Sequence, residues 1–267
     1  MNWREHLRDE GYVQFPHLTP TSLVQAARRS IENDLKTNYD SSRQAIYDNQ
    51  SYCPDLQSAP EIVDLFLRSP VYRIIDELLG TENVNVSPAQ IAIRKAHNCP
   101  EPIPPEPHID GFASGLNGVP ADRIYNHTVL VGVFLTPVVT EFAGNFTVWP
   151  KSHCEYERYF RVRGPAAMRE PQPVLELGSP KQLLADPADV VLAHYALGHA
   201  AAVNTSSADR IAVYFRIGLK DAESQNWQYL TDIWKGWRNL EAPAGSVNNV
   251  PHPGFGHPLP VGEGTRD

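Results

Sequence analysis

The run Arg210-Ile-Ala-Val-Tyr-Phe-Arg216 constrains the fold more than any other stretch, because its side chains alternate between two characters. Successive side chains of a β-strand point to opposite faces of the sheet. Arg210 and Arg216 therefore share one face. The opposite row predicts a sheet packed under helices, and it consists of Ile211, Val213, Phe215 and Ile217.

Further strands are predicted on both sides of a proline-rich loop. Thr128 to Thr136 is almost continuously β-branched and apolar, which is typical of a strand buried on both faces. Gln90 to Lys95 alternates, and either of its rows can face a cavity. Asn98 to Pro107 carries five prolines, so it is a loop rather than a central strand. Shorter strands are expected at Tyr12–Phe15, Val84–Val86, Asn145–Trp149 and Ala188–His194.

Helical patterns dominate the N-terminal third. Residues 3–10 predict a short helix that ends at Gly11, and Thr19 is expected to cap a longer helix that covers a sheet. Two more helices are predicted over 61–67 and 70–79. Residues 40–57 are polar and predict a loop near a pocket mouth, where Tyr47 and Tyr52 either line the mouth or anchor the loop.

Length and composition favour one large domain. At 267 residues, 42% hydrophobic and a mean hydropathy of -0.36, the chain is long enough for a full core. We expect a single domain over 1–267, with helices over about 1–80 and an irregular segment over about 221–267. The tryptophans near 227–237 are expected in a short helix. They either line the substrate pocket, form a subunit contact or pack in the core.

Charge and cysteine content exclude several classes. A net charge of -8 and a pI near 5.7 argue against a nucleic-acid surface, so we expect a small-molecule substrate. Cys53, Cys99 and Cys154 are widely spaced and suggest neither disulfides nor a zinc knuckle. Without an apolar leader or a long apolar run, the sequence predicts a cytoplasmic protein with no membrane contact. The oligomeric state stays open.

The pair His108 and Asp110 is the first candidate for metal binding. In an extended chain the i, i+2 spacing aims an imidazole and a carboxylate the same way. A third ligand from a distant strand, with His194 and His199 as the candidates, would complete the two-histidine, one-carboxylate set that leaves positions open on Fe(II). Zinc accepts the same ligands.

Arg210 follows His199 by eleven residues, about the length needed to finish a strand, turn and enter its antiparallel neighbour. A guanidinium grips a carboxylate in a bidentate way, so a 2-oxo acid bound to the metal is the expected guest. Arg216 is the alternative anchor because it shares the face of Arg210. Gln90 and Arg94 are further candidates for contact with the cosubstrate or the substrate.

In motif order, the chain resembles the phytanoyl-CoA dioxygenase (PhyH) family of Fe(II)/2-oxoglutarate-dependent oxygenases. The resemblance rests on His108/Asp110, then Gly144 to His153 (G-N-F-T-V-W-P-K-S-H), then His199, Asn204, Ser206 and Arg210, and it covers roughly residues 85–217. Of the two candidates, only His199 has the spacing to the following N-x-S motif and arginine that the family shows. The resemblance therefore implies His108, Asp110 and His199 as catalytic metal ligands. His153 is expected to be structural, because loop histidines usually form hydrogen bonds to the backbone. The resemblance also implies a double-stranded β-helix, a jelly-roll of cupin-like form.

The resemblance further implies Fe(II), 2-oxoglutarate and O2 as cofactors. The expected reaction releases succinate and CO2 and hydroxylates an unactivated C–H bond. Asp110 argues against halogenation, because halogenases of the family carry a small residue there. The tryptophan that many relatives place beside the cosubstrate is absent at Val131, Gly132 and Val133.

Two alternatives use the same residues. One is a zinc-dependent hydrolase or lyase, which leaves Arg210 without a role, and the other is a non-catalytic jelly-roll binding protein. The sequence does not identify the substrate. The segment 155–184 is a potential lid, and its arginines either contact an anionic substrate or form a solvated charged face. These arginines are Arg158, Arg161, Arg163 and Arg169.

Overall fold

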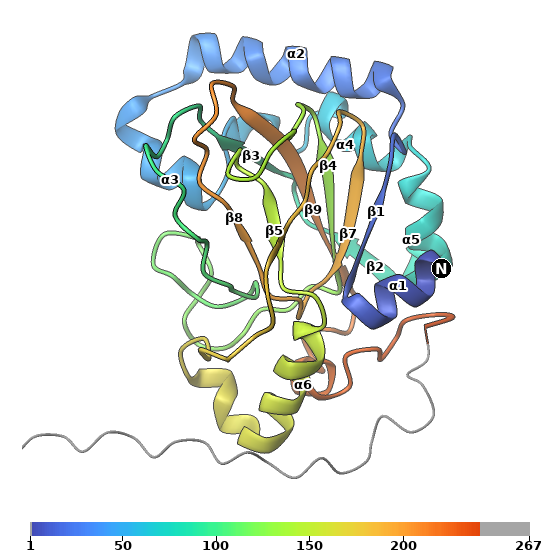
Figure 1. Cartoon of the computed structure of the whole chain (residues 1–267). Helices are drawn as coiled ribbons and strands as arrows, with labels where there is room; N and C mark the ends of the chain where they lie inside the picture. Colours follow the sequence, from blue (N-terminus) through green and yellow to red (C-terminus); the bar gives the residue numbers. More distant parts are fainter. Residues whose placement is uncertain (1, 241–267) are drawn as a thin grey trace, which may run out of the picture.

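The computed structural model describes residues 2–240, in which two antiparallel sheets face each other (Figure 1). The larger sheet has the order β1-β7-β4-β9-β2, with β3 also paired to β9, and the smaller sheet has the order β6-β5-β8. The strands are β1 (Tyr12–Phe15), β2 (Val84–Val86), β3 (Gln90–Arg94), β4 (Val129–Phe134), β5 (Phe146–Val148), β6 (Lys181–Gln182), β7 (Val190–His194), β8 (His199–Ala201) and β9 (Arg210–Leu219). The predicted jelly-roll with flanking helices is confirmed.

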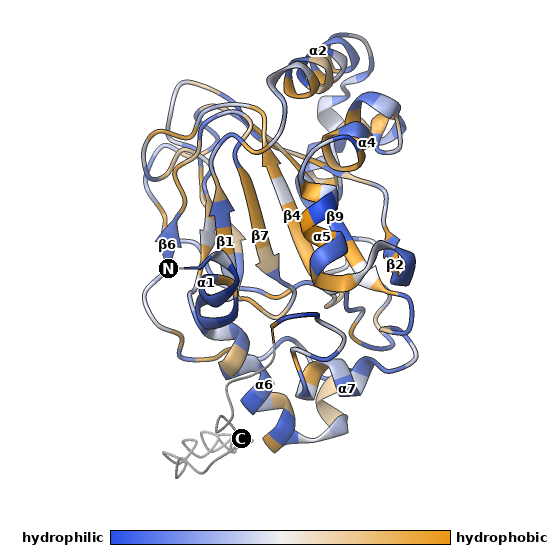
Figure 2. Ribbon diagram, turned by 90° about the vertical axis from the view of Figure 1, so that its right-hand side faces the viewer, coloured by the Kyte–Doolittle hydropathy of each residue, from blue (hydrophilic) through white to orange (hydrophobic). Residues whose placement is uncertain are grey.

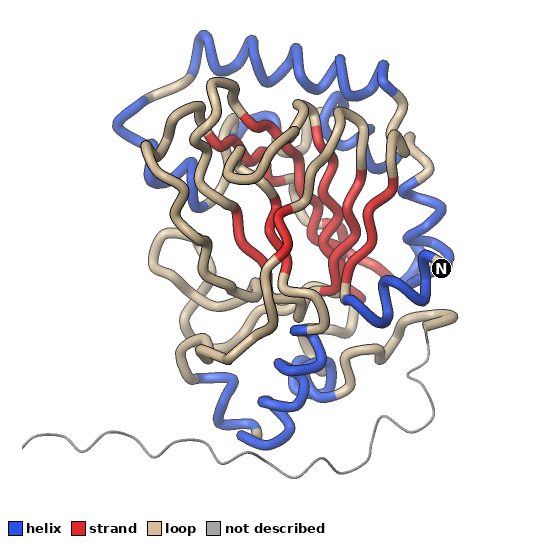
Figure 3. The backbone as a smooth tube through the Cα atoms, in the orientation of Figure 1, coloured by secondary structure: helices blue, strands red, loops and turns tan. Residues whose placement is uncertain are grey.

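The helices gather at the N-terminus and around the sheet ends (Figure 3). The α-helices are α1 (Trp3–Glu10), α2 (Thr21–Asn38), α3 (Gln44–Asn49), α4 (Pro60–Leu67), α5 (Val71–Leu79), α6 (Ser152–Arg163) and α7 (Asn226–Thr231). Short 3-10 turns lie at Ser41–Arg43, Pro54–Leu56, Thr81–Asn83 and Pro165–Arg169. None of the helices in residues 2–240 has the length and apolar character needed to cross a membrane.

Strict alternation along β9 places a different core on each face of the larger sheet. Val213 and Phe215 join a cluster that includes residues of α2, α4 and α5, whereas Ala212 and Tyr214 join the cluster between the two sheets. Strand β4 divides in the same way, since Val131 faces the helical side. Figure 2 shows α1, α4 and α5 outside this sheet. The inner face is left to form a cavity with the smaller sheet.

Helix ends follow the sequence in most places. Asn2 and Glu5 form a capping box at α1, and Gly11 ends that helix with a left-handed φ of 82°. The expectation that Thr19 caps α2 is wrong, because the helix begins at Thr21 and its start has no side-chain hydrogen bond. The loop expected over 40–57 contains α3.

The C-terminal expectations are tested only in part. A short helix is present, but α7 contains only Trp227, and Trp234 and Trp237 lie beyond its end. Of the irregular segment expected over about 221–267, the part 241–267 lies outside the described residues. The single-domain organisation over 1–267 stays a prediction.

Candidate metal centre and cosubstrate pocket

A cavity of about 1040 Å³ opens between the two sheets. Its walls come from segments far apart in the sequence: α3, β3, the loop 108–127, the turn after α6, β8 and β9. His108, Asp110, His199 and Arg210 all line it, so the residues singled out by the sequence meet in one place.

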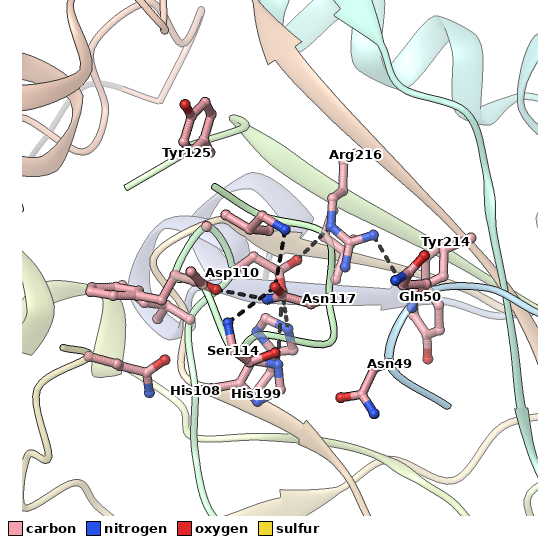
Figure 4. A pocket seen from close by; sticks show the side chains of 18 of the residues that line it. Asn49, Gln50, His108, Asp110, Ser114, Asn117, Tyr125, His199, Tyr214 and Arg216 are labelled. Carbon is pink, nitrogen blue, oxygen red and sulfur yellow. Dashed lines mark hydrogen bonds and ion pairs between the residues drawn. The ribbon is translucent and has the colours of Figure 1, made fainter. Parts of the chain in front are cut away.

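His108, Asp110 and His199 form a compact group of potential metal ligands. One donor atom from each lies within 4.8 Å of the others. Asp110 Oδ1 is 3.8 Å from His108 Nε2 and 3.7 Å from His199 Nε2, and the two imidazoles lie side by side below the carboxylate (Figure 4). Two nitrogens and one oxygen at this spacing suit a divalent transition metal.

Backbone pairing brings the two histidines together. His108 N donates to His199 O at 3.0 Å, and His199 N donates to His108 O at 2.8 Å. This bridge joins the proline-rich loop to β8, so His108 lies on an isolated bridge rather than in the strand that its spacing suggested. Asp110 lies in the turn that follows, and Gly111 continues that turn with φ of 95°.

Neighbouring groups fix the orientation of the ligands. His199 Nδ1 is 2.9 Å from Leu197 O, which assigns the proton to Nδ1 and leaves the Nε2 lone pair for a metal. Burial alone would raise the pKa of Asp110, but the Arg216 guanidinium beside it holds this pKa well below its usual range. Removal from bulk water lowers the pKa of His108 to about 4, although its ring faces the open cavity. The site therefore offers a carboxylate and neutral His108.

Arg216 connects Asp110 to β3. Its Nε donates to Asp110 Oδ2 at 2.8 Å (Figure 4). Its Nη1 donates to Gln90 Oε1 at 2.9 Å. Because Oδ2 is occupied, Oδ1 is the oxygen that stays available between the two histidines. The row that contains Gln90 and Arg94 thus faces the cavity.

Arg210 has a different environment. Its side chain is 2% exposed, Nε donates to Gly144 O at 2.6 Å and Nη1 donates to Ala92 O at 3.0 Å. Burial lowers the pKa of this guanidinium. Among residues 2–240 no carboxylate forms an ion pair with it. A buried cation with only neutral partners is costly, and an anionic ligand would compensate it.

Other sequence candidates lie away from the cavity. His194 is buried and its Nε2 is 2.8 Å from Ile233 O, while His153 Nε2 is 3.0 Å from Arg8 O. Trp234 and Trp237 pack against His194 and do not line the cavity. These observations support structural roles for both histidines and core packing for the tryptophans.

The segment after β5 is helical, which the sequence did not suggest. Arg158 and Arg161 pair with Glu155 and Glu157 on the surface of α6, as in a solvated charged face, and Arg163 pairs with Glu170 beyond the helix. Arg169, in contrast, lines the cavity.

Three polar features of the cavity escaped sequence reasoning. Tyr214 packs against Gly132, where a Cβ would lie 2.6 Å from the tyrosine ring, so this ring fills space beside the position expected for a tryptophan. Asn126 and His127 also line the cavity. Polar residues just before the apolar strand β4 are the only signal that points to them.

Comparisons with known proteins identify the family and the fold. Residues 7–212 match the model of the family described as phytanoyl-CoA dioxygenase (PhyH). No curated protein matches the sequence of the chain.

Several solved structures share the fold. A nickel complex of the non-heme monooxygenase ThoJ has a TM-score of 0.52 and 18% identity over 82% of this chain and 79% of its own. HygX from Streptomyces hygroscopicus with nickel and 2-oxoglutarate bound has a TM-score of 0.53 and 14% identity. The match covers 82% of this chain and 86% of HygX. The epimerase SnoN in complex with Fe3+, alpha ketoglutarate and nogalamycin RO has a TM-score of 0.52 and 15% identity. The match covers 81% of this chain and 82% of SnoN.

Proposed function

The chain belongs to the phytanoyl-CoA dioxygenase family, and from this premise we propose that it is an Fe(II)- and 2-oxoglutarate-dependent oxygenase. We assign His108, Asp110 and His199 as its metal ligands. The observation that carries the proposal is the compact donor group in one cavity with Arg210, a buried guanidinium that lacks an anionic partner in residues 2–240.

The donor set fits iron. The imidazoles of His108 and His199 and the Asp110 carboxylate would hold the ion, and a set of three protein ligands would leave further positions open to the cosubstrate. Zinc accepts these donors too, but a zinc hydrolase has no use for Arg210. Family membership and the arginine together favour the oxygenase.

When bound, iron with 2-oxoglutarate and O2 supplies oxidation of an unactivated C–H bond, with succinate and CO2 as the other products. Arg210 binds the far carboxylate of the cosubstrate, and Arg216 keeps Asp110 anionic and oriented. Apolar walls such as Phe146 limit water near the metal. We propose hydroxylation as the outcome. Since SnoN, which shares the fold, is described as an epimerase, product analysis has to decide this point.

Gln90 is proposed as a second contact for the cosubstrate. Its Oε1 accepts from Arg216, and its amide nitrogen has no hydrogen bond to another residue in 2–240. That N–H group can donate to a carboxylate oxygen of the ligand.

Anaerobic titration with Fe(II) and then 2-oxoglutarate tests the proposal without a substrate. We expect a visible charge-transfer band on addition of the cosubstrate, followed by slow succinate release in air. His108→Ala, Asp110→Ala and His199→Ala should each abolish Fe(II) binding while far-ultraviolet circular dichroism stays that of the folded protein.

Fe(II) binding without the band would refute the cosubstrate assignment and direct attention to zinc and hydrolysis. Full iron affinity in any one of the three variants would remove that residue from the ligand set.

A further inference from the structure

We propose that the segment Arg123–His127 forms a polar subsite that recognises an uncharged hydroxyl or amide group of the substrate beside the metal ligands. This proposal rests on the proposed oxygenase function and specifies the chemistry of its substrate. It is carried by a contrast between the backbone of the segment, which is firmly anchored, and the side chains of Asn126 and His127, which have unpaired polar atoms within residues 2–240.

The anchors come from three directions. Tyr125 N donates to Gly111 O at 2.9 Å, and the side-chain amide of Asn226 donates to Ile124 O. Immediately after the segment, Thr128 N donates to Ile217 O at 2.7 Å on β9. The backbone of the segment is therefore held on both sides of Asn126.

Several buried polar atoms on the side chains of this segment have no hydrogen-bond partner in the described part of the chain. Among residues 2–240, ten buried side-chain nitrogen or oxygen atoms have no hydrogen-bond partner, and four of them belong to Arg123, Asn126 and His127. Both amide atoms of Asn126 and Nε2 of His127 are in this group, and all three residues line the cavity. Folded proteins rarely leave buried polar groups unpaired, so a cluster of them at a cavity wall points to a ligand.

Contact with Gly111 places the subsite next to the metal ligands. A Cβ at Gly111 would lie 2.4 Å from Tyr125 O, so the segment packs directly on the residue that follows Asp110. His127 is 7% exposed and lines the same cavity as Asp110 and Arg216. A substrate group held here would bring its neighbouring C–H bonds to the open side of the metal.

The chemistry of the two side chains selects the group. An asparagine amide offers a donor and an acceptor, and its terminal torsion is broad, so it can turn towards a group in the cavity. Burial lowers the pKa of His127 to about 3, so its ring is neutral at physiological pH. Neutral donors and acceptors favour a hydroxyl or an amide over an ion, whose desolvation they would not repay.

Ligand-observed NMR with three fragments of matched carbon skeleton, cyclopentanol, cyclopentanecarboxamide and cyclopentane, tests the subsite. The protein is studied alone and with Zn(II) and 2-oxoglutarate, because zinc is a diamagnetic substitute for iron. We expect the alcohol and the amide to bind more tightly than the hydrocarbon. Asn126→Leu and His127→Phe should each weaken both polar fragments by roughly tenfold, the loss expected for one or two buried hydrogen bonds, while Zn(II) and 2-oxoglutarate affinities stay unchanged.

Thermal unfolding supplies a second readout. Removing an unpaired polar group at a functional site should leave Tm unchanged or raise it by about 2–4 °C. Thr147→Val is the matched control, because its buried hydroxyl also lacks a partner but lies outside the cavity lining. This variant should leave fragment binding intact.

Two results would overturn the subsite. One is equal binding of the fragments by wild type and both variants, and the other is a loss of several degrees in Tm for Asn126→Leu, which would show that the amide is satisfied by structural water. Neither result touches the proposed oxygenase, which fails instead if wild-type protein binds no 2-oxoglutarate in the presence of metal.

Discussion

At the scale of single residues, two arginines on β9 face the same cavity with different partners. Arg216 meets the carboxylate of Asp110, whereas Arg210 meets only the backbone carbonyls of Gly144 and Ala92. Alternation along the strand predicted their common face but not this division, because the choice of partner depends on how the loop 108–111 crosses the sheet. The uncompensated guanidinium is the better anchor for an anionic cosubstrate.

Arg210→Gln should therefore weaken 2-oxoglutarate binding by about 10- to 100-fold, the equivalent of a hydrogen bond to a charged group. Fe(II) affinity should stay within a factor of a few. Isothermal titration under anaerobic conditions measures both constants.

Arg216→Gln is the matched control on the same strand. Because it releases Asp110, it should lower metal affinity by about 10- to 100-fold, as loss of a group that orients a metal ligand usually does. If Arg210→Gln leaves cosubstrate affinity unchanged and Arg216→Gln reduces it, the anchor is Arg216.

At the scale of elements, the turn before β5 shapes the cosubstrate end of the cavity. Gly144 has φ of 74°, and a Cβ there would lie 2.7 Å from Arg94 Cβ and 3.1 Å from Arg210 Cβ. Its carbonyl also accepts from Arg210. A side chain at this turn would push on both arginines.

Gly144→Ala should destabilise the protein by more than the roughly 1–2 kcal/mol that left-handed strain costs, and it should also weaken 2-oxoglutarate binding. Gly115→Ala separates the two effects, since Gly115 also has a positive φ, of 76°, but no atom within 4 Å of its Cβ position. Urea unfolding and cosubstrate titration of both variants provide the comparison. Equal losses in the two would show that strain alone is responsible.

Helix α6 has a buried histidine in its first turn. His153 is 0% exposed, and burial lowers its pKa to about 4. In the unfolded chain a histidine titrates near 6.5, so between about pH 6.5 and 4 the unfolded state binds the extra proton. The contribution of His153 to the free energy of unfolding should therefore be constant above pH 6.5. By pH 5 protonation of the unfolded state should have reduced the free energy of unfolding by about 2 kcal/mol.

His153→Gln should make the loss of stability between pH 7 and 5 shallower, whatever its cost at pH 7. Urea unfolding at several pH values measures the slope. His97→Gln, at an exposed position, controls for the loss of a histidine as such, and an identical slope in wild type and His153→Gln would contradict the assignment.

Elements with a clear periodicity of apolar residues could be predicted from the sequence, whereas polar segments could not. Strand β9 and the ends of α1 and α5 follow from alternation and from Gly11 and Gly80. Helices α3 and α6 were missed, because their polar surfaces carry little apolar pattern and tertiary contacts decide their state. In the same way, the ligand spacing suggested the metal centre, but nothing local revealed the unpaired groups of Asn126 and His127.

At the scale of the whole molecule, the proposed centre joins the loop 108–111, β3, β8 and β9. A ligand that binds only this assembled state stabilises it by mass action. At 100 times the dissociation constant, Fe(II) with 2-oxoglutarate should contribute about 2.7 kcal/mol. This corresponds to roughly 5–10 °C in Tm.

Differential scanning fluorimetry under argon measures this shift. Asp110→Ala, which lacks a ligand, should show none, and the same shift in that variant would place the metal elsewhere.

The central position of β9 has a consequence for how the protein is made. This strand pairs with β4, β3 and β2, yet it is the last strand among residues 2–240 to leave the ribosome. Until it emerges, the nascent chain already contains His108, Asp110 and His199, but the larger sheet lacks the strand to which β2, β3 and β4 pair. Because chains are synthesised at about 5–20 residues per second, the earlier strands wait with open edges for several seconds. A nascent chain stalled before Arg210 should therefore recruit chaperones and hold no iron.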